Sequence, residues 1–110
     1  AEQITMFWRD PRDPIQMAPR SSSTLIMPNH AAYLQALKEN HDEHEFKSSY
    51  EFFGDADASA LIGKVLFELP WNAGHGVGEI ALLDNRKVMH ASYYPRASDK
   101  GYPISVRYLL

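Results

Sequence analysis

The order of hydrophobic and polar residues divides the chain into short segments, most of which have the two-residue period of a β-strand. Alternation rich in β-branched and aromatic side chains predicts strands over residues 3–9, 24–27, 45–53 and 103–110. Two more strands, 79–83 and 87–94, flank Asp84-Asn85, a pair that tolerates the left-handed backbone of a tight turn. These last two segments are therefore expected to form a β-hairpin.

Residues 30–40 have the spacing of a helix with one buried face. Ala32, Tyr33, Ala36 and Leu37 recur on that face, and the preceding Asn29 is of a type that caps helix N-termini. A helix is predicted over this segment.

Residues 58–69 have the same helical spacing over three turns, with apolar residues at i, i+3, i+4, i+7, i+8 and i+11. Asp55 or Asp57 can cap this second helix and Pro70 ends it, although Gly63 costs about 1 kcal/mol relative to alanine in a helix interior. A strand over 64–71 is the alternative, because a short apolar run fits either structure.

The connections are rich in proline, serine and glycine. Residues 10–22 contain Asp10-Pro11, Asp13-Pro14, Pro19 and three consecutive serines, which predict an extended loop, and residues 72–78 are rich in glycine. The chain as a whole, 1–110, is expected to be one α+β domain. Its core would be a mainly antiparallel sheet of about five to six strands, with two helices packed on one face.

Composition narrows the classes of function. The 110 residues include no cysteine, which excludes thiolate nucleophiles, iron–sulfur clusters and cysteine-ligated zinc. A net charge of −3 makes nucleic acid an unfavoured partner, and no apolar run approaches the roughly 20 residues of a membrane span. We expect a soluble protein without a cofactor, either cytoplasmic or exported after removal of a signal peptide ahead of Ala1.

Two local clusters could bind small ligands or metals. Gly74 and Gly76 flank His75, so the backbone could approach a ligand closely beside a titratable imidazole, although such a segment is more often a plain connection. His41 and His44 lie three residues apart, a spacing that suits one metal ion on a helical turn. The metal site would need a third ligand from elsewhere in the chain, and a solvated polar run is the simpler interpretation.

The expected hairpin brings together a candidate acid–base group. With a two-residue loop at Asp84-Asn85, Glu79 lies directly opposite His90, and Arg96 follows the second strand of the hairpin. A carboxylate, an imidazole and a guanidinium could serve a small hydrolase, for example one that cleaves RNA, with His75 as a second candidate base. A solvent-exposed polar pair without chemistry is the competing interpretation.

Aromatic residues near strand ends suggest a binding surface. Tyrosine and tryptophan contribute large contact area plus one hydrogen-bonding group, and the candidates are Trp8, Trp71, Tyr93 and Tyr94, with Arg96 beside them. We therefore favour a small acidic binding module that recognises a protein partner or a small molecule through this surface and the 10–22 loop, and that could form a homodimer. The hydrolase is the alternative function.

Overall fold

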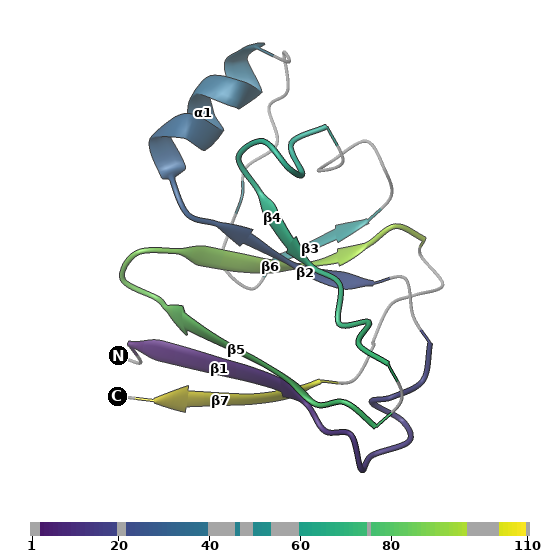
Figure 1. The fold of residues 1–110 in the computed structure, drawn as a ribbon. Helices are drawn as coiled ribbons and strands as arrows, with labels where there is room; N and C mark the ends of the chain where they lie inside the picture. Colours follow the sequence, from purple (N-terminus) through teal and green to yellow (C-terminus); the bar gives the residue numbers. More distant parts are fainter. Residues whose placement is uncertain are drawn as a thin grey trace.

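Two β-sheets and a helix form three layers in the computed structural model, which describes residues 3–19, 22–39, 46, 50–53, 60–74, 76–96 and 104–109 (Figure 1). Within these residues the elements are β1 (Ile4–Arg9), β2 (Ser23–Met27), α1 (His30–Glu39), β3 (Tyr50–Phe53), β4 (Phe67–Leu69), β5 (Glu79–Asp84), β6 (Met89–Tyr94) and β7 (Ser105–Leu109).

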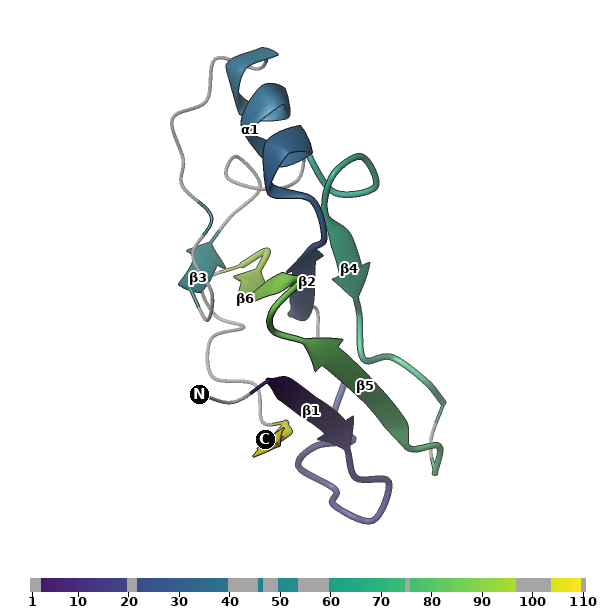
Figure 2. The ribbon, with the colours of Figure 1, turned by 90° about the vertical axis from the view of Figure 1, so that its left-hand side faces the viewer.

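The strands divide into a three-stranded and a four-stranded sheet. The three-stranded sheet has the order β5-β1-β7 and is antiparallel throughout. The four-stranded sheet has the order β3-β6-β2-β4, in which β3 runs parallel to β6 and the other neighbours are antiparallel. Figure 2 shows α1 beyond the four-stranded sheet and the three-stranded sheet on its other side.

The prediction of one sheet with two helices on one face was wrong. The strands at 79–83 and 87–94 exist, but they do not pair with each other: β5 pairs with β1, and β6 pairs with β2 and β3. Asn85 extends the ladder of β1, because its backbone N–H donates to Gln3 O at 2.8 Å and its Nδ2 donates to Thr5 Oγ1 at 2.6 Å. The chain then crosses to the other sheet instead of folding back as a hairpin.

The second predicted helix is also absent from the part of 58–69 that the structure describes. Residues 60–66 form turns, and β4 continues from them along β2, so the strand alternative was closer. Gly63 has a φ of 87°, which a right-handed helix excludes, and its N–H donates to Leu66 O at 2.8 Å. Leu61 and Leu66 are nevertheless buried, so the apolar spacing identified core residues but not their backbone conformation.

The helix at 30–40 is confirmed as α1, with the cap that the sequence predicts. Asn29 Oδ1 accepts the N–H of Ala32 at 3.1 Å, which satisfies a backbone donor of the first turn. Tyr33 and Leu37 of α1 pack with Leu25 and Tyr93 in a hydrophobic core on one side of the four-stranded sheet. One helix therefore covers this face, supplemented by the turns at 60–66.

A second core lies between the two sheets. Phe7 and Leu83 of the three-stranded sheet pack with Trp71, and Ile26 and Leu69 of the four-stranded sheet close this core from the opposite side. Inward and outward residues alternate along β1, with Thr5, Phe7 and Arg9 buried. The opposite face of the three-stranded sheet is covered by no described element.

Candidate functional site

The predicted aromatic surface is largely interior. Trp71, Tyr93 and Tyr94 are buried, whereas Trp8 is half-buried on β1 and Arg96 is exposed. Tyr93 belongs to the core beneath α1, and Tyr94 faces the space between the sheets. These side chains therefore do not form one continuous surface.

The remaining predicted residues are dispersed. Gly74 and Gly76 are exposed in the connection before β5, and Gly76 has a φ of 81°. His75, His41 and His44 lie outside the described residues, so their proposed roles stay predictions. Among the residues that are described, no cluster of three histidine or carboxylate side chains could hold a metal ion.

Glu79 and His90 lie on different sheets and do not meet. Glu79 is opposite Arg9 on β1, and His90 is opposite Ile26 on β2. The predicted pairing required the hairpin that does not form. The carboxylate of Glu79 is bound instead to Arg9, so the hydrolase hypothesis loses the acid–base pair on which it depended.

Arg9 is the most buried charged side chain among the described residues, and it was not among the site residues predicted from the sequence. Its side chain is 5% exposed and donates to the carboxylate of Glu79 at 2.7 Å and to the carbonyl oxygens of Gln16, Trp71 and Ala73. The same Glu79 oxygen also accepts the N–H of Ala73 at 3.0 Å. Arg9 thus joins the 10–19 loop, the connection after β4 and β5.

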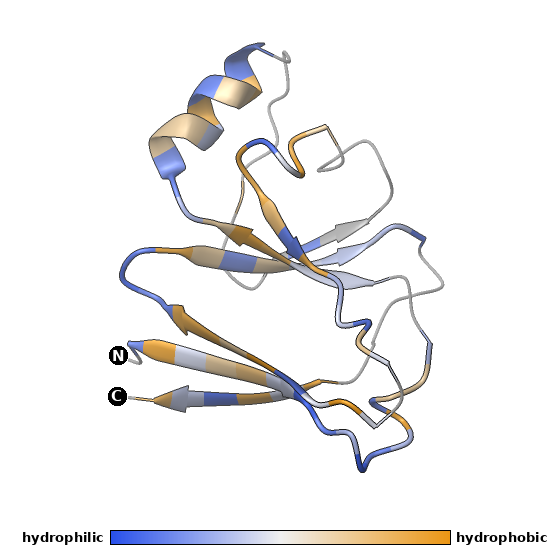
Figure 3. Ribbon diagram, viewed as in Figure 1, coloured by the Kyte–Doolittle hydropathy of each residue, from blue (hydrophilic) through white to orange (hydrophobic). Residues whose placement is uncertain are grey.

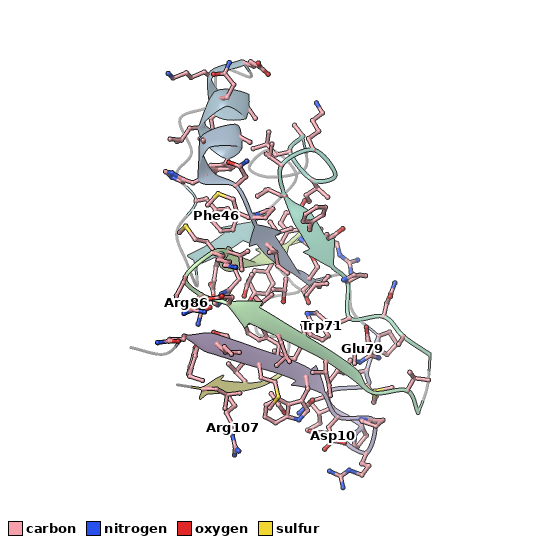
Figure 4. The ribbon with its side chains drawn as sticks, turned by 60° about the vertical axis from the view of Figure 1, so that its left-hand side comes forward. Asp10, Phe46, Trp71, Glu79, Arg86 and Arg107 are labelled. Carbon is pink, nitrogen blue, oxygen red and sulfur yellow. The ribbon has the colours of Figure 1, made fainter. Side chains whose placement is uncertain are left out.

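The strand alternation could have identified this role. Thr5, Phe7 and Arg9 share one face of β1. If the apolar Phe7 faces the core, Arg9, two residues later, must face it as well. A buried guanidinium needs acceptors for its donors, and a carboxylate is the strongest available. Figure 4 shows Glu79 near Trp71 at the end of the inter-sheet space where these groups converge.

His90 lines a small hollow between the sheets. The hollow has a volume of about 150 Å³, and its walls include Phe7, Ser92, Tyr94 and Tyr108. The rings of Phe7 and His90 meet edge to face, with centroids 5.0 Å apart. Burial lowers the pKa of His90 below its ordinary value of 6.5, so the imidazole is neutral at pH 7.

The lowered pKa of His90 predicts loss of stability in mild acid. The unfolded chain binds a proton at this histidine near pH 6.5, and the folded chain binds it only at lower pH. The contribution of His90 to the free energy of unfolding is therefore largest above about pH 7 and decreases as the pH falls below 7. In urea unfolding at a series of pH values, His90→Gln should flatten this decline, whereas exchange of the exposed His30 by glutamine should preserve it. Equal declines in the two variants would contradict the assignment.

The outer face of the three-stranded sheet is apolar and exposed. We use this name for the face formed by Ile4, Met6 and Trp8 of β1, Ile80, Leu82 and Asp84 of β5, and Ser105, Arg107 and Leu109 of β7. Ile80 is 71% exposed and Leu82 63% exposed. Figure 3 shows hydrophobic residues along most of β5, and Figure 4 shows Arg107 extending away from β7.

β5 is also an edge strand, and half of its backbone groups point away from β1. The N–H of Asn85 donates to Gln3 O in the register of the β1–β5 ladder, and hydrogen-bonded pairs alternate along antiparallel strands. The pairs at Glu79, Ala81 and Leu83 are therefore bonded to β1. The N–H and C=O groups of Ile80 and Leu82 and the N–H of Asp84 face outward, whereas the carbonyl oxygen of Asp84 accepts the N–H groups of Lys87 and Val88 in the following turn. We call this outward side the β5 edge.

A hollow of about 380 Å³ lies at the beginning of the β5 edge. Its lining includes Trp8 and Ile80 of the outer face together with Pro11, Arg12 and Gly78. Gly78 packs closely there, because a Cβ atom at this position would lie 3.1 Å from the Pro11 ring. The start of the proline-rich loop thus forms one wall of a recess next to Trp8.

Two similar aspartate–arginine pairs flank β5. Asp10 and Arg12 form a two-pronged ion pair beside the hollow, and Asp84 and Arg86 form another at the far end of the strand. Hydrogen bonds from the arginine side chain and backbone lower the pKa of each aspartate. Figure 4 shows Arg86 and Glu79 at opposite ends of β5.

Comparison of the chain with protein-family models, with curated proteins and with solved structures finds no match. In the part of the chain that the structure describes, no helix is long and apolar enough to cross a membrane.

Proposed function

We propose that the protein is a binding module that takes up an extended strand of a protein partner along the β5 edge. The observation that carries this proposal is the coincidence of outward-facing backbone groups with the exposed side chains of Ile80 and Leu82 on the same strand. An added strand satisfies such an edge through main-chain hydrogen bonds, and its alternate side chains extend the apolar outer face.

Comparison with the other sheet edges supports the choice of β5. The β3 edge has four residues, with Glu51 among them. β7 has Arg107 in its centre and β4 has only three residues, with Glu68 in the middle; both features discourage strand addition. β5 has six residues, and its four interior positions are Ile, Ala, Leu and Leu, without charge or proline. Trp8 and the 10–12 segment, at the adjoining hollow, would contact the side chains that follow the added strand.

Hydrogen exchange measured by NMR tests this proposal. The probe is a synthetic peptide of alternating valine and threonine with a lysine at each end, and the same peptide with a central proline is its control. On addition of the first peptide, the amides of Ile80, Leu82 and Asp84 should gain protection at least about tenfold, while those of Ala81 and Leu83, already bonded to β1, should change little. Equal changes at all five amides, or no change in a solution dilute enough for the protein to be monomeric, would contradict strand addition.

A further inference from the structure

We propose that the strand taken up by β5 is β5 of a second copy of this chain, paired antiparallel about a twofold axis at Ala81. The inference rests on the proposed function and names its partner. The two three-stranded sheets would then form one continuous sheet of six strands, and neither copy would keep an exposed β5 edge.

The distribution of side chains along β5 makes this register self-complementary. With the axis at Ala81, Ile80 of each copy lies opposite Leu82 of the other. The two most exposed apolar residues of β5 therefore contact each other at two symmetric positions. The outward-facing backbone groups of Ile80 and Leu82 meet as hydrogen-bonded pairs, and Ala81 meets Ala81 of the second copy in the intervening non-bonded pair.

The neighbouring register is less favourable. With the axis at Leu82, Asp84 of one copy would lie opposite the apolar Ile80 of the other. With the axis at Ala81, Asp84 lies opposite Gly78, which has no side chain to obstruct it. Both registers keep the outer faces of the two copies on the same side of the joined sheet, because paired residues share a face.

Charges at the two ends of the paired strands are complementary. Gly78 is next to Pro11, so the Asp84–Arg86 pair of one copy approaches the Asp10–Arg12 pair of the other, at the hollow beside Trp8. Each end then combines two carboxylates with two guanidinium groups. Arg12 is well exposed and can bind the incoming aspartate without leaving its own.

Sedimentation velocity over a range of concentrations tests the association. The full chain should approach twice its mass of 12.5 kDa as concentration rises. Leu82→Lys should lower the association constant at least about tenfold, because it places a charge in the apolar contact. Leu109→Lys, on the same outer face but on β7, should leave association unchanged. A strict monomer, or equal loss in both variants, would overturn the proposal; thermal unfolding verifies that each variant is folded.

Single cysteines test the register, since the natural chain contains none. A non-bonded antiparallel pair has Cα atoms about 4.5 Å apart, within the range of a disulfide, so Ala81→Cys should give a covalent dimer on mild oxidation. Leu82→Cys places the two cysteines on a diagonal, with Cα atoms about 7–8 Å apart, and should crosslink at least about tenfold more slowly. Crosslinking of Leu82→Cys at an equal or greater rate would overturn the register.

The two proposals can fail separately. If the peptide protects Ile80 and Leu82 while the chain sediments as a monomer, strand addition stands and self-pairing falls. If neither peptide binding nor self-association occurs at β5, both proposals fall. Protection of these amides that rises with protein concentration, without added peptide, would support self-pairing directly.

Discussion

Replacement of Arg9 by methionine is expected to lower the free energy of unfolding by about 3 kcal/mol, the lower end of the range for breaking a buried ion pair from one side, because the Glu79 side chain is 25% exposed. Arg9 is buried, and the variant would leave the Glu79 carboxylate and the carbonyl oxygens of Gln16 and Trp71 without their shared donor. The methionine side chain has a length similar to that of arginine but donates no hydrogen bond. The loss of stability therefore measures the lost hydrogen bonds and charge more than the lost volume. Urea unfolding at neutral pH measures it.

A control substitution at Arg107 shows whether the loss of stability is specific to the buried Arg9 or follows from removing a positive charge at any position. Arg107 lies on the exposed outer face, so Arg107→Met should change the free energy of unfolding by much less. The double variant with Arg9→Met and Glu79→Met should be more stable than the sum of the two single losses implies, because neither charge is then left without its oppositely charged partner. Equal losses for Arg9→Met and Arg107→Met would show that the cluster does not hold the sheets and loops together.

Replacement of Trp71 by alanine is expected to cost about 3–5 kcal/mol, as for other buried aromatic residues. Trp71 is 3% exposed and fills the core between the sheets, with Nε1 donating to Thr24 Oγ1 at 2.8 Å. Trp71→Phe should cost less than Trp71→Ala, because it retains most of the buried area and loses the hydrogen bond. Denaturant unfolding followed by circular dichroism gives all of these values.

Trp8 provides the control for Trp71, because the sequence suggested the same binding role for both. Trp8 is half-buried on the outer face, so Trp8→Ala should cost clearly less stability than Trp71→Ala. The proposed function further expects Trp8→Ala to weaken strand uptake, since Trp8 lines the hollow beside the β5 edge. A larger loss of stability for Trp8→Ala than for Trp71→Ala would contradict the division into a structural and a surface tryptophan.

Local pattern predicted the strands well because alternation depends only on which faces are buried. The segments 3–9, 87–94 and 103–110 contain the strands found there, and 45–53 contains β3 at its end. The segments 24–27 and 79–83 each fall one residue short of the observed strand. The capped helix α1 followed from Asn29 and four apolar residues within one segment. In each case the determining interactions lie within a few residues of one another in the chain.

The same local reasoning failed where the choice depended on distant partners. Residues 60–66 have helical spacing, but a left-handed Gly63 and the pairing of β4 with β2 decide against a helix. Asp84-Asn85 suits a hairpin turn, yet Asn85 bonds to Gln3 and Thr5, more than 75 residues earlier in the sequence. A turn-compatible pair allows a hairpin without requiring one, because strand pairing is a long-range competition.

The sequence by itself determined the segments that alternate, the cap of α1 and the absence of thiol chemistry. Only the tertiary structure decided which strands pair, and the pairing changed the candidate sites. Glu79 forms an ion pair with Arg9 and does not meet His90, and β5 lies at the edge of its sheet. The physical reason is that side-chain alternation is a property of each strand, whereas register and neighbours depend on the combined burial and hydrogen bonding of the whole chain.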